Sequence, residues 1–167
     1  DLGINIEWTC SARADTLDEG TIRIMSKAGC KKILLGIETG SERMQGEINK
    51  HLKIDEVRET IETLIRYKIE IQANFIYGFP KENEEDLIKT LDLVRFCVEE
   101  MQILETTIHK CSCYPGTHIY MTYRDKLILN EDAFYLFRYP AKNQVDFIKS
   151  YPNLLSNLFI LDGMLFD

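Results

Sequence analysis

Residues 73–91 read ANFIYGFPKENEEDLIKTL and place a strand pattern, a turn and a helix start in immediate succession. The β-branched and aromatic run ends at Gly78-Phe79-Pro80, because Gly and Pro favour a turn over a continued strand. Asn83 can cap the helix that follows, and the acidic residues 84–86 suit its positive first turn. The apolar spacing predicts one buried stripe on this helix, formed by Leu87, Leu91, Val94 and Val98.

The same strand–helix unit recurs along the chain, which predicts an α/β fold. Strands are predicted at residues 4–8, 32–37, 69–77 and 101–110. The second of these is apolar throughout, so we expect both of its faces to be covered. One helix is predicted to start at Thr16, which has the spacing of a capping box with Glu19, and another to cover residues 54–65. Repeats of about 30–40 residues are typical of βα units, so we expect a parallel sheet with helices outside.

Composition narrows the class of protein. The 167 residues carry a net charge of −7 and show no cluster of Lys and Arg, which argues against a nucleic-acid-binding surface. No apolar run approaches the roughly 20 residues of a membrane span. The five cysteines are irregularly spaced and do not resemble a disulfide framework, so we expect a reducing, cytoplasmic environment.

Several residues directly after the predicted strands are candidates for function, since parallel α/β proteins place their sites on these loops. Glu38 can accept hydrogen bonds from a ribose or an ammonium group, whereas Ser41 also fits a plain helix cap. Glu82 follows the third strand, where helix capping is the alternative role. Arg13 can pair with Asp15 or hold a ligand carboxylate.

One pair of cysteines, Cys111 and Cys113, lies close in sequence to His109 and His118. A C-x-C pair without a second pair of ligands holds a metal poorly, and alternate residues of a strand share a face by geometry alone. We therefore predict no metal-ligating residues in this chain.

A series of short motifs, taken in order, resembles the radical SAM superfamily. The motifs are Trp8-x4-Arg13-x-Asp15, Ala28-Gly29-Cys30, Gly36-Ile37-Glu38-Thr39-Gly40-Ser41, Asn49-Lys50, Phe75-Ile76-Tyr77-Gly78-Phe79-Pro80-Lys81-Glu82 and Tyr114-Pro115-Gly116-Thr117. They cover residues 4–120. The branch they resemble is the one often associated with a cobalamin-binding domain and related to elongator-type and methylthiotransferase-type enzymes.

The resemblance implies a partial TIM-type (βα) barrel with S-adenosylmethionine and a 4Fe–4S cluster as cofactors, and leaves cobalamin open as a third. Residues 1–117 would supply strands three to six of a six-stranded barrel, and residues 118–167 a helical C-terminal extension. The activity implied is that of an oxidoreductase or transferase that cleaves S-adenosylmethionine to a 5′-deoxyadenosyl radical and acts on a small-molecule substrate.

The resemblance also implies roles for individual residues around one shared cavity. Glu38 and Ser41 would meet the ribose or amino-acid part of S-adenosylmethionine, and Arg13 would line the substrate mouth or hold a carboxylate. The adenine and ribose would lie beside Ile76, Gly78 and Glu82, with Tyr114, Gly116 and Thr117 closing the adenine side. Lys81 stands where this turn commonly has Gly, at a position that needs a positive φ.

The chain departs from the family pattern in its cysteines, since a C-x-x-x-C-x-x-C run is needed to hold the cluster and none is present. We therefore expect a fragment that is inactive alone, has no catalytic residue, binds no cofactor by itself and partners a missing N-terminal part of the same chain. The alternative is a non-enzymatic α/β module that binds a nucleotide-like ligand or docks a partner. Removal of neighbouring strands predicts self-association, through the edge at residues 4–8 or through residues 154–166.

Overall fold

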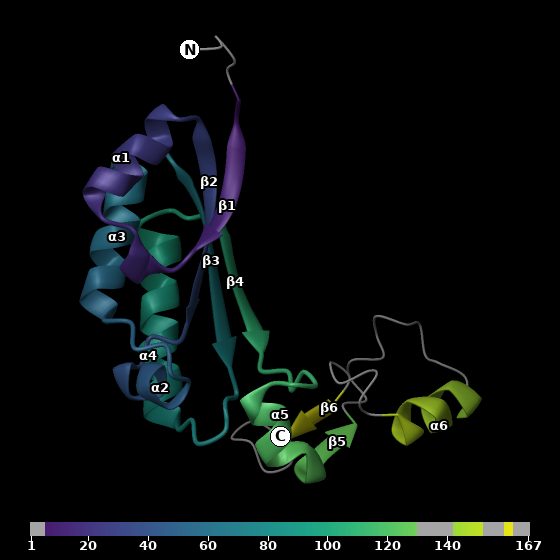
Figure 1. Cartoon of the computed structure of the whole chain (residues 1–167). Coiled ribbons are helices and arrows are strands. Elements are labelled where there is room, and N and C mark those ends of the chain that lie inside the picture. Colours follow the sequence, from purple (N-terminus) through teal and green to yellow (C-terminus); the bar gives the residue numbers. More distant parts are fainter. Residues whose placement is uncertain (1–5, 130–141, 152–158, 162–167) are drawn as a thin grey trace. The chain divides into compact units, whose positions relative to one another are not determined.

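The computed structural model describes residues 6–129, 142–151 and 159–161 (Figure 1). The chain forms two units. Unit 1 consists of Asp1–Tyr77 and Glu82–His109, and unit 2 of Gly78–Lys81 and Lys110–Asp167.

Unit 1 is built around a four-stranded sheet. Its strands are β1 (Trp8–Ala12), β2 (Cys30–Glu38), β3 (Glu70–Tyr77) and β4 (Glu105–Lys110), hydrogen-bonded in sequence order. The pairing is parallel, with Ser11 opposite Leu34 and Gly36 opposite Asn74. The predicted α/β class with parallel strands is therefore confirmed.

Four helices connect the strands and lie along one face of the sheet (Figure 1). They are α1 (Glu19–Lys27), α2 (Glu42–Glu47), α3 (Ile54–Arg66) and α4 (Glu84–Arg95), which continues into a π-helical turn at Phe96–Glu100. A single 3-10 turn, Ala14–Thr16, joins β1 to α1. Connections of this kind bring the C-terminal ends of all the strands to one edge of the sheet.

The hydrophobic core lies between these helices and the sheet. In β2 the buried residues Ile33, Leu35 and Ile37 alternate with the partly exposed Leu34 and Gly36. The expectation that β2 is covered on both faces is therefore wrong for the described residues. Successive residues of a strand point to opposite faces of the sheet, and helices cover only one of these faces. The apolar residues of β2 therefore alternate between buried and partly exposed positions.

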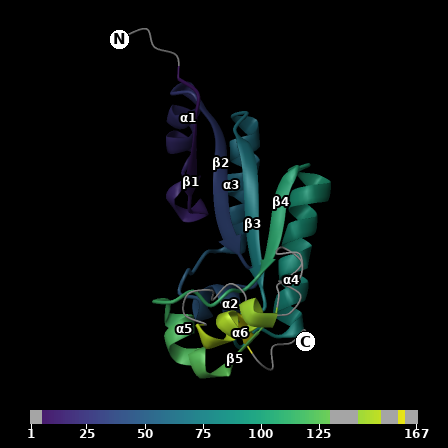
Figure 2. The same cartoon turned by 90° about the vertical axis from the view of Figure 1, so that its right-hand side faces the viewer.

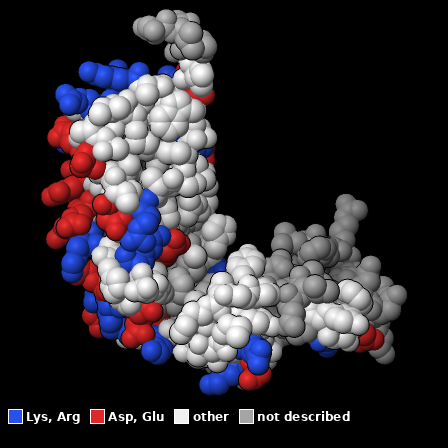
Figure 3. Space-filling model, viewed as in Figure 1, with Lys and Arg blue, Asp and Glu red and all other residues white. Residues whose placement is uncertain are grey.

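The opposite face of the sheet is turned toward the viewer in Figure 2, with the strands in front of the helices of unit 1. Charged side chains of unit 1 gather over the helices in Figure 3. The opposite face of the sheet, which no helix of unit 1 covers, is called the open face below and carries the side chains that can reach a ligand at the strand ends.

Two predicted boundaries near the N-terminus are corrected. The first strand is Trp8–Ala12, and Ile6 and Glu7, which the prediction included, precede it. Residues 4 and 5 of the predicted strand lie outside the described residues. At the start of β1, Trp8 N donates to Gly29 O and the indole Nε1 donates to Ala28 O. Helix α1 is capped by Asp18 and not by Thr16. The Thr16 hydroxyl donates to Arg13 O within the preceding turn, and Asp18 Oδ1 accepts from Thr21 N at 2.6 Å.

The buried stripe of α4 is also corrected. Asn83 caps this helix, and with Asp86 forms a complete capping box, as its sequence predicts. The face that is buried, however, carries Asp86, Thr90 and Leu93. Of the predicted stripe, Val94 packs against the core, whereas Leu91 is 47% exposed and Val98 49% exposed. Asp86 accepts a hydrogen bond from Ser41 Oγ and Thr90 accepts one from Gly40 N, and these bonds select this face over the more apolar one.

Unit 2 contains α5 (His118–Tyr123), a 3-10 turn (Arg124–Lys126) and α6 (Lys142–Ser150). It also contains an antiparallel pair of short strands, β5 (Leu127–Leu129) and β6 (Phe159–Leu161), in addition to the predicted helices. Of the segment 154–166 expected to self-associate, only β6 falls within the described residues. No helix in the described part of the chain is long and apolar enough to span a membrane.

Candidate cofactor-binding site

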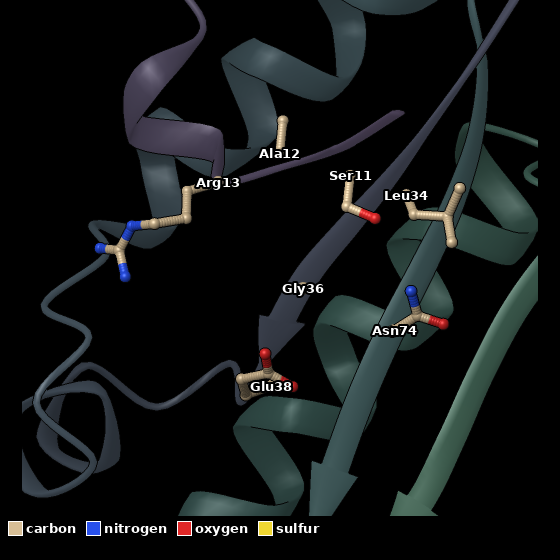
Figure 4. Close-up of a pocket in the computed structure, with 7 residues that line it drawn as sticks. All are labelled: Ser11, Ala12, Arg13, Leu34, Gly36, Glu38 and Asn74. Carbon is tan, nitrogen blue, oxygen red and sulfur yellow. The ribbon is translucent and has the colours of Figure 1, made fainter. Parts of the chain in front are cut away.

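An open depression of about 490 Å³ lies on the open face of the sheet in unit 1, toward the C-terminal ends of β1 and β2 (Figure 4). It is lined by Ser11, Ala12, Arg13, Leu34, Gly36, Glu38 and Asn74. Its volume falls in the range of roughly 300–1,000 Å³ that small-molecule sites occupy. Two of the predicted site residues, Arg13 and Glu38, are thus brought to one depression.

Glu38 ends β2 in an unusual backbone conformation. Its φ is 68°, and the pairing of β2 with β3 shifts register between Gly36 and Glu38. A bulge of this kind re-aims a side chain at the end of a strand. The Glu38 carboxylate consequently lies over Gly36, where an added Cβ would come within 2.7 Å of Glu38 Oε1.

The carboxylate of Glu38 forms an ion pair with Lys50, with 2.7 Å between Nζ and Oε1. Lys50 Nζ also donates to Gly36 O. The Lys50 side chain is 13% exposed and the Glu38 side chain 23% exposed, so the pair is largely withdrawn from water. Glu38 lines the depression, and Lys50, which is not among the lining residues, holds the Glu38 carboxylate in place. The sequence placed Lys50 in a motif but gave it no role.

Arg13 lines the depression with its stem while its guanidinium is occupied elsewhere. In Figure 4 the side chain extends away from Ser11 and Asn74. Its Nε and Nη2 donate to the two Asp15 carboxylate oxygens at 3.0 and 2.8 Å, and Nη2 also donates to Lys50 O at 2.7 Å. The hydrogen bond with Arg13 lowers the pKa of Asp15. Of the two alternatives for Arg13, the structure shows the pairing with Asp15, and it adds a link to the Lys50 backbone.

Asn74 is a lining residue that the sequence did not single out. Its Oδ1 accepts hydrogen bonds from Gln72 Nε2 at 3.3 Å and from Thr107 Oγ1 at 2.8 Å. Among the described residues none accepts a bond from Asn74 Nδ2, which remains a donor on the open face. Ile76 follows two residues later on β3 and so projects from the same face of the strand. The only sign of Asn74 in the sequence is that it is a polar residue between the apolar Ala73 and Phe75 of a predicted strand.

Ser41 and Glu82 are both buried at this edge of the sheet. Ser41 caps α2 by accepting from Met44 N, and its hydroxyl donates to Asp86 Oδ1 at 2.5 Å. Glu82 is 5% exposed and directly precedes the cap of α4. Neither of them lines the depression. The bond between Ser41 and Asp86 nevertheless joins the loop after β2 to the first turn of α4.

The remaining predicted site residues belong to unit 2. Gly78 and Lys81 have φ values of 78° and 69°, so Lys81 does adopt the left-handed conformation expected at that position. Tyr114 is 57% exposed, and Thr117 caps α5 by accepting from Tyr120 N while its hydroxyl donates to Tyr114 O. Gly116 has a φ of 85°, with open space around the site of a Cβ.

The cysteines are poorly suited to hold a metal cluster. Cys30, Cys97, Cys111 and Cys113 are buried, and Cys10 is partly buried. Burial raises the pKa of the Cys97 thiol to about 11 and raises that of Cys30 and Cys113 as well, whereas a metal ligand must be a thiolate. Within the described residues, no three His, Cys, Asp or Glu side chains are grouped so that they could hold a metal ion.

Comparison with known proteins identifies relatives over about two thirds of this chain. The chain is 28% identical to an uncharacterized methyltransferase of Pyrococcus horikoshii over 118 residues, which is 71% of this chain and 25% of that protein. It is 33% identical to the tRNA-2-methylthio-N(6)-dimethylallyladenosine synthase of Ruegeria sp., covering 67% of this chain and 25% of that protein. The chain thus spans about a quarter of the length of these relatives.

A solved structure shares the fold. The radical S-adenosylmethionine methyltransferase TsrM from Kitasatospora setae, with cobalamin and a 4Fe–4S cluster bound, matches 75% of this chain and 24% of its own with a TM-score of 0.64. The sequence identity is 12%, so this likeness concerns the fold alone. The family model of the Radical SAM superfamily matches residues 2–94, more than half of the chain. This protein therefore belongs to the radical SAM superfamily.

Proposed function

We propose that this chain is the part of a radical SAM enzyme that binds and orients S-adenosylmethionine, in an oxidoreductase or transferase whose cluster is held by residues outside this sequence. The observation that carries the proposal is the Glu38 carboxylate, which lines the depression at the strand ends and is held there by its ion pair with Lys50. When bound and reductively cleaved, S-adenosylmethionine supplies the 5′-deoxyadenosyl radical that this family uses.

The groups on the depression match those of S-adenosylmethionine in kind. The ammonium of the cofactor has a complement in the Glu38 carboxylate that lines the depression. Asn74 Nδ2 is a neutral donor suited to a ribose hydroxyl or an adenine ring nitrogen. The side chain of Leu34 offers an apolar part of the lining against which a nucleoside can lie.

The predicted contact residues divide into two kinds under this proposal. Glu38 faces the ligand, with Ile76 on the same sheet face nearer the strand end. Ser41 is fully buried and Glu82 nearly so, which favours roles in holding the loop and the helix rather than in touching the cofactor. Arg13 acts on the site through the Lys50 backbone. The adenine contacts of Gly78, Tyr114, Gly116 and Thr117 remain proposals that rest on the resemblance.

The cluster does not fit the residues of this chain. Its ligands would be three closely spaced thiolates, and the five cysteines are scattered between Cys10 and Cys113 without the required spacing. We therefore assign to this chain no cluster ligand and no step that involves the cluster.

Anaerobic reconstitution tests the proposal. The 167-residue chain, treated with ferrous iron, sulfide and a reductant, is expected to bind no cluster and to release no 5′-deoxyadenosine from S-adenosylmethionine. A longer product of the same gene that includes a C-x-x-x-C-x-x-C segment, expected within about a hundred residues upstream of Asp1, should do both. If the gene encodes no such segment, the non-enzymatic α/β module becomes the better interpretation.

A further inference from the structure

Asp86 is a buried carboxylate that the ligand site does not use directly. Its side chain is 3% exposed and lies in the first turn of α4. It accepts hydrogen bonds from Ser41 Oγ at 2.5 Å, Asn83 N at 3.0 Å and Arg43 Nε at 3.2 Å, and it pairs with Arg43 Nη2. Burying a charge is unfavourable unless it is paired and hydrogen-bonded, and capping α4 does not require Ser41 or Arg43. Asp86 therefore has a second task, which is to hold the segment that begins α2.

A second residue of α4 holds the same segment one turn later. Thr90 Oγ1 donates to Asp86 O, accepts from Gly40 N at 3.0 Å and lies 3.0 Å from Thr39 Oγ1. Because the single Thr90 hydroxyl proton is used within the helix, Thr39 is the donor in the pair of hydroxyls. At Gly40 an added Cβ would come within 2.3 Å of Lys89 O, so this loop lies directly against the α4 backbone.

These contacts fix both neighbours of Glu38. Gln45 Nε2 donates to Ile37 O and Thr39 O, each at 2.8 Å, and so spans Glu38 from one side to the other. Glu38 itself has the left-handed φ of 68°, which a non-glycine residue keeps only where the surrounding structure holds it. The orientation of the Glu38 carboxylate over Gly36 thus depends on the loop that α4 holds.

We propose that Asp86 is a positioning residue for Glu38: by holding Ser41 and Arg43 it fixes the loop that aims Glu38 at the ligand. The inference rests on the proposed function for the identity of the ligand. It adds that the affinity for S-adenosylmethionine depends on a side chain that does not touch it. Asp86 neither lines the depression nor contacts Glu38 or Lys50 within the described contacts.

The first test needs no ligand. Hydrogen exchange of the amides of Thr39, Gly40 and Ser41 is measured in the 167-residue chain, since all three amides are hydrogen-bonded in this loop. Asp86→Asn should speed their exchange by about tenfold while the amides of β2 keep their protection. The matched control is Asp92→Asn, an exposed acid on the same helix, which should change nothing. Unchanged exchange in Asp86→Asn would overturn the inference.

The second test is a double-mutant cycle in the complete enzyme, with S-adenosylmethionine affinity as the readout. Asp86→Asn should weaken binding by about tenfold, and it should add no further loss in the Glu38→Ala background, because both changes remove one interaction. Additive losses would show that Asp86 acts on folding rather than through Glu38. If Asp86→Asn does not fold, Ser41→Ala takes its place in the cycle, because it removes the hydrogen bond to Asp86, together with the cap of α2, and leaves the buried carboxylate in place.

The two tests separate the two claims. Faster loop exchange together with an affinity that is insensitive to Glu38→Ala would refute the proposed function. It would leave Asp86 as a residue that merely holds the loop. If amide exchange in the loop is as slow in Asp86→Asn as in the wild type, while Glu38→Ala does weaken the affinity for S-adenosylmethionine, the positioning role alone is refuted.

Discussion

Asp86 shows how one buried charge links stability to the candidate site. Burial alone would raise the pKa of this carboxyl, but the hydrogen bonds from Arg43, Ser41 and Asn83 outweigh burial and lower it to about 2 from 3.8. A carboxyl whose pKa is lower in the folded than in the unfolded chain stabilises the fold above its unfolded value. That stabilisation is about 2 kcal/mol, and it disappears as the pH falls through the folded value.

The first prediction follows from this linkage. Between about pH 4 and about pH 2 the wild-type chain should lose roughly 2 kcal/mol of unfolding free energy that Asp86→Asn does not lose. Urea unfolding followed by circular dichroism at several pH values measures the difference. Asp92→Asn, which alters an exposed acid on the same helix, should follow the wild type. Parallel curves for wild type and Asp86→Asn would contradict the assignment of the low pKa to Asp86.

At the scale of elements, α4 is the helix whose two faces are easily confused. One face carries Leu91 and Val98, which are about half exposed, and the other carries Leu93 together with the hydrogen-bonded Asp86 and Thr90. The difference has a direct consequence for stability, because only the buried leucine leaves a cavity when it is truncated.

The second prediction compares the two leucines. Leu93→Ala should cost about 2–5 kcal/mol of unfolding free energy, since Leu93 is 1% exposed and belongs to the core cluster. Leu91→Ala is the matched control and should cost less than about 1 kcal/mol. Denaturant unfolding of both variants measures the costs. Equal costs, or a larger one for Leu91, would mean that the sequence-based stripe and not the observed face is buried.

The helix α4 also shows what the sequence could and could not supply. Periodicity and turn residues were sufficient for the parallel α/β fold, and the run before Gly78 with its capped helix was predicted closely. The choice between the two faces of α4 depends on the hydrogen bonds that Asp86 accepts from Ser41 and that Thr90 accepts from Gly40. These partners are about fifty residues away in sequence, so no local pattern reports them.

The same limit applies to the site. Glu38 was predicted because it directly follows an apolar strand, where α/β proteins place ligand-binding residues. Lys50 and Glu38 are separated in sequence by α2, and they pair only in the folded chain. Asn74 lies at the depression only because β3 pairs with β2, which places it opposite Gly36. Both depend on tertiary pairing, and neither carries a distinctive local signal.

At the scale of the whole molecule, β1 is one of the two edge strands of the four-stranded sheet. Its unpaired backbone groups can bind another chain, and Thr9 and Ser11 on this strand are exposed. Self-association of the isolated chain through this edge is therefore expected, at residues 8–12 instead of the predicted 4–8.

The third prediction tests this edge. Size-exclusion chromatography with light scattering should show the 167-residue chain as a dimer or larger species at high concentration. Thr9→Lys should shift it toward monomer, because a lysine on an edge strand disfavours strand addition. Ile24→Lys, at an exposed position of α1, is the control and should leave the association unchanged. A monomeric wild-type chain at high concentration would rule out association through the edge.

The binding of S-adenosylmethionine at the end of β2 is the claim on which the functional account depends, and Glu38→Ala in the complete, reconstituted enzyme tests it most directly. Affinity for S-adenosylmethionine is measured by calorimetry and iron content by chemical analysis on the same samples. The account predicts an affinity weakened by about tenfold or more with unchanged iron content, because Glu38 contacts the cofactor and not the cluster. Unchanged affinity with a loss of iron would contradict it.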